Sequence, residues 1–190
     1  DLIKKYGADM KLIYSPLHGT GKVVGGRALE NAGFKDYTMV PKQAIADPEF
    51  GTTPFPNPEF AQTFDLAIEL GKKQQADLLI ATDPDADRLG AAVRLPNGDY
   101  KLLTGNQIAA VMLEYILTAH DEAGDLPKNA AAVKSIVSSE LATRIAEAHG
   151  VEMIDVLTGF KYIADQIKHY EETNEHTFMF GFEESYGYLV

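Results

Sequence analysis

The chain has 190 residues, of which 45% are hydrophobic and 24% charged, so it can form one domain or two small ones. Its formal net charge of −11 argues against a protein that binds nucleic acid or an anionic membrane. It contains no cysteine, which excludes disulfides, thiolate metal sites and cysteine nucleophiles. No apolar run reaches the roughly 20 residues of a membrane span. These features indicate a cytoplasmic α/β protein.

The apolar period alternates between the two residues of a strand and the 3.6 residues of a helix. In the first half, this pattern predicts strands at 11–14, 37–40 and 77–82, a helix at 22–31, and a hairpin of 89–95 and 100–103 around Asn97-Gly98. The proline-rich stretch 41–58 cannot be regular, because proline lacks an N–H. A further helix is expected to begin at Asn57-Pro58, with Asn57 as its N-cap.

In the second half, Thr104 and Gln107 form a predicted capping box for a helix. After a polar loop at 121–129, the pattern predicts strands at 131–137, 153–157 and 177–180, and helices at 140–149 and around 160–167. The succession of strand, loop, helix, glycine and strand occurs twice, at 11–40 and 131–157. We therefore expect two consecutive three-layer α/β/α units with mixed, mainly parallel sheets, residues 1–103 and 104–190.

Three aspartates alternate directly after the buried strand 77–82. Asp83, Asp85 and Asp87 stand in the string DPDADRLG, at the carboxyl end of a strand, where α/β sheets bind their ligands. Carboxylates this close repel one another unless a cation lies among them, and an oxygen-only ligand set favours Mg²⁺. Arg88 follows and offers a bidentate donor to phosphate. The alternative is a solvated acidic turn.

Two other interpretations of this loop can be tested against the amino-acid sequence. An EF-hand needs Gly and Glu where this chain has Arg88 and Arg94, so calcium binding of that kind is excluded. A phosphatase with an aspartate nucleophile would place it and its acid/base partner two residues apart, as Asp83 and Asp85 are. That pattern expects Thr or Val where Asp87 stands, but the interpretation stays open.

Three further loops carry polar groups. HGTGK at 18–22 lies between a strand and a helix, and is either an anion site or a plain turn. His18 is expected to be structural or solvated, with a catalytic role as the alternative. Thr158 and Gly159 open a helix, where Thr158 is either the N-cap or a ligand contact. Glu183-Glu184-Ser185 follows the last buried strand and is either a surface hairpin or a binding loop.

Taken together, these segments resemble the α-D-phosphohexomutase superfamily, the phosphoglucomutases and phosphomannomutases. The matching strings are SPLHGTG (15–21), PFPNPE (54–59), ATDPDADR (81–88), LTGFKYI (157–163) and GFEESYG (181–187). Bacterial phosphoglucomutases with phosphomannomutase-like sequence are most similar. Members of this family have four domains, and this chain resembles the second and most of the third. It starts with Asp1 and stops in an expected strand, so we expect a piece of a longer protein.

The resemblance implies a reaction and a set of site residues. A phosphoryl group would move between O1 and O6 of a hexose phosphate through a bisphosphorylated sugar, with a glucose 1,6-bisphosphate-type activator. Mg²⁺ would bind Asp83, Asp85 and Asp87, with Arg88 as the catalytic residue beside the phosphoryl group. The sugar would be bound by Thr158, Gly159, Glu183 and Ser185.

The resemblance also names what this sequence lacks. The phosphorylated serine of the family belongs to the first domain, and the loop that grips the distal phosphate belongs to the fourth. Neither loop occurs in this chain, so we expect this segment alone to be inactive. An aspartate-nucleophile phosphatase and a non-catalytic sugar-phosphate binding module remain the alternatives.

Overall fold

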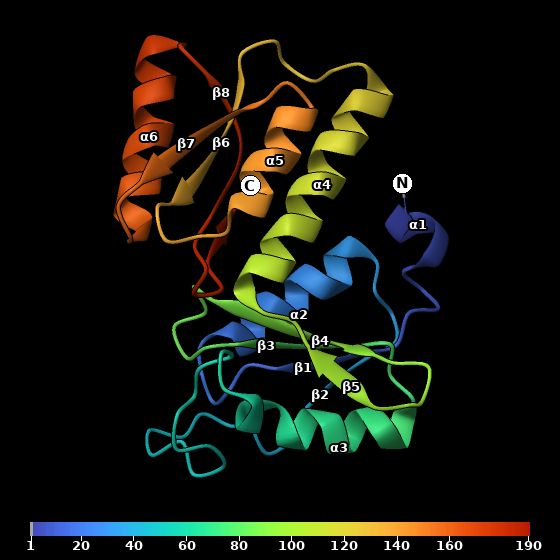
Figure 1. Ribbon diagram of the computed structural model, residues 1–190. Helices are drawn as coiled ribbons and strands as arrows, with labels where there is room; N and C mark the ends of the chain where they lie inside the picture. Colours follow the sequence, from blue (N-terminus) through green and yellow to red (C-terminus); the bar gives the residue numbers. More distant parts are fainter. Residues whose placement is uncertain (1) are drawn as a thin grey trace. The chain divides into compact units, whose positions relative to one another are not determined.

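The computed structural model describes residues 2–190, and the chain divides into two compact units, residues 1–103 and 104–190. Each unit has a sheet with helices on both faces (Figure 1). Four of the seven strand pairings formed by the described residues are parallel, so the expected fold of two α/β/α units with mixed sheets is confirmed. Within residues 2–190, no helix has the length and apolar character that crossing a membrane requires.

The first unit has a five-stranded sheet in the order β2-β1-β3-β4-β5. Its elements are α1 (Leu2–Tyr6), β1 (Leu12–Ser15), α2 (Gly21–Ala32), β2 (Tyr37–Met39), a 3₁₀ helix η1 (Ala61–Phe64), α3 (Asp65–Gln74), β3 (Leu78–Thr82), β4 (Leu89–Arg94) and β5 (Tyr100–Leu102). In Figure 1, α2 lies on one face of this sheet and α3 on the other. One core cluster contains Ile13, Phe64 and Leu79, all nearly inaccessible to solvent.

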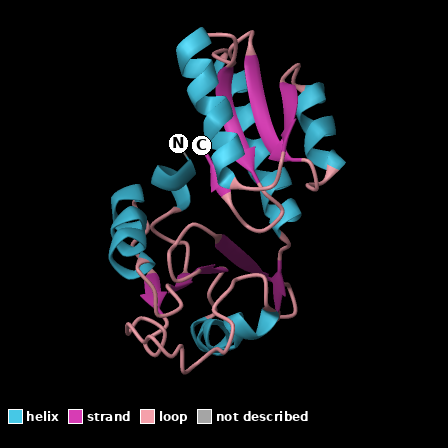
Figure 2. Cartoon of the chain, turned by 90° about the vertical axis from the view of Figure 1, so that its left-hand side faces the viewer, coloured by secondary structure: helices cyan, strands magenta, loops and turns pink. Residues whose placement is uncertain are grey.

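The second unit has a four-stranded sheet in the order β7-β6-β8-β9. Its elements are α4 (Gly105–Ala123), β6 (Ala130–Ser135), α5 (Glu140–Ala148), β7 (Glu152–Val156), α6 (Phe160–Thr173), β8 (Thr177–Phe182) and β9 (Tyr188–Leu189). Helices α4 and α5 cover one face of the sheet and α6 covers the other (Figures 1 and 2).

The two units share a strand order, which explains the repeat seen in the sequence. β1 is parallel to both of its neighbours, β2 and β3, and β6 is parallel to both of its neighbours, β7 and β8. An antiparallel strand, β4 or β9, then follows on the side of β3 or β8. The repeat is therefore a shared topology, with β5 added in the first unit.

One local expectation was wrong, and one short helix was missed. The helix expected from Asn57-Pro58 begins later, with η1 at Ala61 and α3 at Asp65, because Phe60 is extended (φ −92°, ψ 123°). Asn57 closes a local turn instead, since its Oδ1 accepts a hydrogen bond from the N–H of Glu59 at 2.9 Å. The short helix α1 was not predicted.

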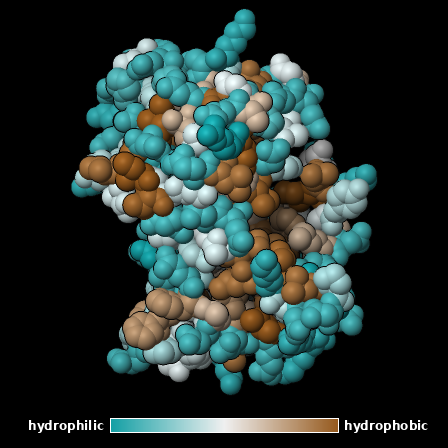
Figure 3. Space-filling model, viewed as in Figure 1, coloured by the Kyte–Doolittle hydropathy of each residue, from teal (hydrophilic) through white to brown (hydrophobic). Residues whose placement is uncertain are grey.

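Other local signals were confirmed. Thr104 and Gln107 form both hydrogen bonds of the capping box at the start of α4. The chain turns at Asn97-Gly98 between β4 and β5, and 41–58 contains no helix or strand. The surface in Figure 3 is mostly hydrophilic with scattered apolar patches, which is ordinary for a folded chain.

Candidate active site

The aspartate loop and the loop after β1 emerge from the same edge of the first sheet. β1 and β3 are adjacent and parallel, so their carboxyl ends coincide. The aspartate loop spans residues 83–88 and joins β3 to the antiparallel strand β4. The expected position at the carboxyl end of a strand is therefore confirmed.

The three aspartates converge. One oxygen from each of Asp83, Asp85 and Asp87 lies within 4.8 Å of the other two. Asp83 is buried at the base of the loop, while Asp85 and Asp87 are exposed. A tight turn draws the carboxylates together, with Ala86 in the left-handed region (φ +65°) and its N–H bonded to the carbonyl of Asp83 at 3.1 Å. This set of carboxylate oxygens fits a hard cation such as Mg²⁺.

Arg88 holds Asp83 from two directions. Its backbone N–H donates to Asp83 Oδ1 at 3.0 Å, and its Nε lies 3.7 Å from Asp83 Oδ2 and 3.9 Å from Asp87 Oδ1. The Arg88 side chain is 40% exposed, so part of the guanidinium remains open to an anion arriving from solvent.

Burial raises the pKa of Asp83 to about 6. The N–H of Arg88 opposes this rise, and the negative charges of Asp85 and Asp87 add to it. The folded chain therefore resists placing a full negative charge at Asp83, even with the guanidinium of Arg88 3.7 Å away. A cation among the three carboxylates would relieve that resistance.

The loop after β1 supports the aspartate loop by packing. The N–H and the hydroxyl of Thr20 both donate to the carbonyl of Pro84, at 2.8 and 3.1 Å. A Cβ at Gly19 would lie only 2.3 Å from the Pro84 Cα. Of the two interpretations of the string HGTGK, the contacts of this loop match the plain turn.

His18 has a structural role in the same loop. It is 7% exposed, its Nδ1 lies 2.7 Å from the carbonyl of Ile45, and its Nε2 lies 2.7 Å from Thr52 Oγ1. Both ring nitrogens are used, so His18 ties this loop to the proline-rich stretch, as the structural interpretation expects.

In the second unit, the predicted sugar residues come from adjacent loops. Thr158 and Gly159 follow β7, Glu183 and Ser185 follow β8, and β6 lies between these strands. The N–H of Gly159 donates to Glu183 Oε1, so the two loops touch. Thr158 is exposed to solvent, and Ser185 is half-buried. The N-cap of α6 is Gly159, so Thr158 is not the cap.

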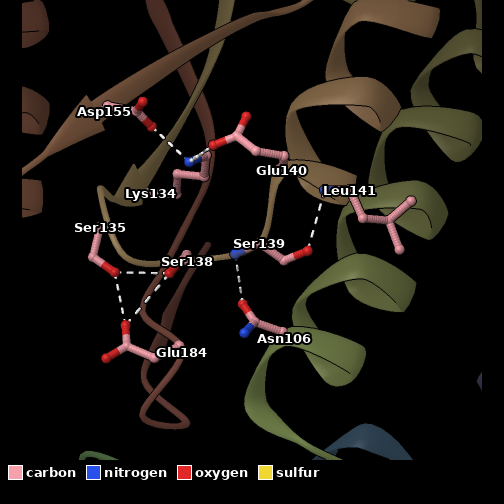
Figure 4. A network of polar contacts seen from close by, with 9 residues as sticks. All are labelled: Asn106, Lys134, Ser135, Ser138, Ser139, Glu140, Leu141, Asp155 and Glu184. Carbon is pink, nitrogen blue, oxygen red and sulfur yellow. Dashed lines mark hydrogen bonds and ion pairs between the residues drawn. The ribbon is translucent and has the colours of Figure 1, made fainter.

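Sequence reasoning missed the residues that hold the loop after β8. Figure 4 shows the carboxylate of Glu184 pointing at the hydroxyls of Ser135 and Ser138, at the end of β6. Ser135 Oγ donates to Glu184 Oε2 at 2.8 Å. The sequence carried little signal for this contact, because the strand was predicted at 131–137 and only the structure shows that β6 ends at Ser135.

A second group in Figure 4 surrounds Lys134, whose side chain is fully buried. Its Nζ lies 2.8 Å from Asp155 Oδ1 and 3.1 Å from Glu140 Oε1. Burial lowers the pKa of Lys134, but the hydrogen bonds to Asp155 and Glu140 outweigh it, and the pKa is raised. The ammonium group therefore stays charged and links β6 to α5 and β7.

Comparison with known proteins decides the family. Residues 1–97 match the pattern of phosphoglucomutase/phosphomannomutase alpha/beta/alpha domain II, and residues 104–190 match that of domain III. The chain belongs to the phosphoglucomutase/phosphomannomutase family. It carries domains II and III of that family.

Sequence comparison with a curated relative agrees with this membership, and a solved structure shows the same fold. A phosphoglucomutase of Staphylococcus haemolyticus is 40% identical over 183 residues, which is 96% of this chain and 32% of that protein. The crystal structure of a phosphoglucomutase/phosphomannomutase family protein from Burkholderia thailandensis is similar with a TM-score of 0.74 and 18% identity, over 95% of this chain and 35% of that one. The chain thus spans about a third of the length of these family members.

Another similar structure was solved with ligands. Aspergillus fumigatus N-acetylphosphoglucosamine mutase is similar in its complex with GlcNAc-6P and magnesium, with a TM-score of 0.63 and 17% identity over 94% of this chain and 35% of that one. Its complex with glucose 1,6-bisphosphate gives 0.61 and 19%, over 93% of this chain and 32% of that one. At such identities, these likenesses show the fold.

Proposed function

We propose that the protein carrying this chain is a Mg²⁺-dependent phosphohexomutase that interconverts hexose 1-phosphate and hexose 6-phosphate. The observation that carries the proposal is the convergence of Asp83, Asp85 and Asp87 within 4.8 Å, beside Arg88, in a chain of this family. The Aspergillus relative, which was crystallised with a sugar phosphate and magnesium, supports the same ligand classes.

Each charged residue of the aspartate loop has a role in this proposal. Asp83, Asp85 and Asp87 would hold the Mg²⁺, which when bound neutralises charge on the transferring phosphoryl group. The exposed part of Arg88 would donate to the oxygens of that group. Arg88 also keeps Asp83 in place through its backbone N–H, so a single residue orients both the metal ligand and the phosphate.

The second unit would hold the sugar. Glu183 Oε1 is used by the N–H of Gly159, so we assign its second oxygen to a sugar hydroxyl. Ser185 would add a further hydrogen bond, and Thr158 with Gly159 would select the orientation of the ring.

The phosphoserine that exchanges the phosphoryl group would come from the first domain, and the loop that binds the distal phosphate from the fourth. A glucose 1,6-bisphosphate-type activator would keep the serine phosphorylated, and the bisphosphate complex of the Aspergillus relative supports this class.

The decisive experiment measures mutase turnover in the full-length protein. We expect conversion of glucose 1-phosphate or mannose 1-phosphate to the 6-phosphate, dependent on Mg²⁺ and abolished by a chelator. Asp85→Asn is expected to lower turnover by at least about 100-fold without unfolding the protein, because it removes one charge from the metal site. Asp9→Asn, at an exposed aspartate before β1, serves as the matched control and should be silent.

Other outcomes point to the alternatives. Release of inorganic phosphate from a generic phosphate ester, without isomerisation, would favour the phosphatase with Asp83 as nucleophile. Saturable binding of hexose phosphate without turnover would favour the binding module. Near-normal turnover of Asp85→Asn would contradict the metal assignment.

A further inference from the structure

The segment 183–187, hereafter the sugar loop, is fastened to the second unit through two neighbouring carboxylates. Glu183 accepts the N–H of Gly159 at the start of α6. Glu184 accepts the hydroxyl of Ser135 at 2.8 Å and lies 3.5 Å from that of Ser138 (Figure 4). The two glutamates thus attach the loop to the ends of two different strands, β7 and β6.

The partners of Glu184 are buried hydroxyl groups that require a hydrogen-bond acceptor. Ser135 and Ser138 are 0% and 5% exposed, and their hydroxyl oxygens lie 2.7 Å apart. Each hydroxyl carries one proton. One of the two protons forms the hydrogen bond between the hydroxyls, and the other is left to be donated to a further acceptor. The carboxylate of Glu184 accepts this second hydrogen bond, and a partly buried hydrogen bond to a charged group is among the stronger ones.

The backbone of Glu184 is also closely packed. A Cβ at Gly105, the first residue of α4, would lie 2.0 Å from the carbonyl oxygen of Glu184. Asn106, the next residue, accepts the N–H of Ser139 at 2.9 Å, which ties α4 to the same turn after β6. Side chain and backbone of Glu184 therefore meet one rigid assembly made of α4 and the β6–α5 turn.

We infer that Glu184 is a positioning residue for sugar binding, acting through Ser135 and not by touching the sugar. It holds its two neighbours, Glu183 and Ser185, in the arrangement that binds the sugar hydroxyls. This inference rests on the proposed function, because it assigns those two neighbours to the substrate. The hydrogen bond from Ser135 is what separates Glu184 from a glutamate that merely lies on the surface.

The test compares four variants of the full-length protein: Glu184→Ala, Glu184→Gln, Ser135→Ala and the double alanine variant. Glu184→Ala should raise the KM for hexose 1-phosphate about tenfold, the effect of losing one such hydrogen bond, with kcat and the Mg²⁺ requirement little changed. Glu184→Gln keeps an acceptor oxygen at the same place and should restore KM to within about threefold of wild type. Ser135→Ala removes the same bond from the other side and should match Glu184→Ala. The double variant should be no worse than either single one.

Glu171→Ala is the matched control, since Glu171 is exposed on α6. Amide hydrogen exchange of the sugar loop gives a second readout that does not need turnover, and it should be faster in Glu184→Ala than in Glu171→Ala. If Glu184→Ala does not fold, Ser135→Ala decides the question. A wild-type KM in either alanine variant, or additive effects in the double variant, would overturn the inference. An inactive wild-type protein would instead contradict the proposed function, whatever the exchange shows.

Discussion

The residue at position 19 determines how closely the loop after β1 can approach the aspartate loop. Gly19 faces the backbone of Pro84, and the next residue, Thr20, gives two hydrogen bonds to the Pro84 carbonyl. Pro84 stands between Asp83 and Asp85, so a shift of Pro84 moves two of the three carboxylates that we assign to the metal.

Gly19→Ala is therefore expected to damage the metal site from a distance. The added Cβ, 2.3 Å from the Pro84 Cα, must push backbone aside. We expect a loss of about 1–3 kcal/mol in stability, as for other overpacked sites, and weaker binding of Mg²⁺ in a direct titration. Gly51→Ala is the control, because there the nearest atom is a carboxylate oxygen of Asp47 at 3.1 Å, which needs to move by only a few tenths of an ångström. Unchanged Mg²⁺ affinity in Gly19→Ala would contradict the role given to this contact.

Single residues also show where the sequence alone was insufficient to predict a side-chain contact. The string Glu183-Glu184-Ser185 contains two carboxylates with the same chemistry, and only the structure shows that the first contacts Gly159 and the second Ser135. Similarly, the sequence allowed Thr158 to be either the N-cap or a ligand contact, and the structure shows that Gly159 is the N-cap. Side-chain direction in an irregular loop depends on backbone angles that no periodicity encodes.

At the scale of elements, His149 connects α4 with the end of α5. Its Nδ1 bonds to Asp121 and its Nε2 lies 3.6 Å from Glu114 Oε2, both on α4. The hydrogen bond to Asp121 raises the pKa of His149, partial burial opposes the rise, and the charges of Asp121 and Glu114 add to it.

This raised pKa predicts a pH-dependent contact between the two helices. A histidine whose pKa is higher in the folded state stabilises the fold fully below its unfolded pKa of about 6.5. The contribution is lost as the pH rises through the higher folded-state pKa. The unfolding temperature of His149→Gln should therefore lie below that of wild type at about pH 6, and the gap should close at about pH 9. Asp121→Asn should behave alike, whereas a gap independent of pH would refute the assignment.

Elements with strong local signals were predictable, and those set by packing were not. The buried strand β3, the capping box of α4 and the turn between β4 and β5 all carry explicit local chemistry. The start of α3 was misplaced because Asn57 followed by Pro58 also suits a local turn, and an extended Phe60 follows it. Local preference allows both structures there, and tertiary contacts decide between them.

At the scale of the whole molecule, the chain spans about a third of its relatives' length. We therefore predict that the purified chain 1–190 has no detectable mutase turnover with glucose 1-phosphate or mannose 1-phosphate, although it keeps the aspartate loop and the sugar loop. The physical reason is that, under the proposed function, these loops would supply charge neutralisation and sugar contacts, whereas the group that accepts and returns the phosphoryl would come from outside residues 1–190. The measurement is a coupled assay with the full-length protein as positive control. Turnover of the isolated chain would show that a group within 1–190 carries the phosphoryl.

The sequence by itself predicted the family, the layered α/β class and the residues that we propose as metal ligands. The class follows from periodicity, and the family and the proposed ligands follow from short strings of side-chain types, so all three rest on local properties of the chain. Only the tertiary structure decided which loops meet: Thr20 with Pro84, Gly159 with Glu183, and Ser135 with Glu184. Those pairs lie between 24 and 64 residues apart in the chain. They come together because parallel strands place their carboxyl ends at one edge of a sheet, which is a property of strand order that single letters do not encode.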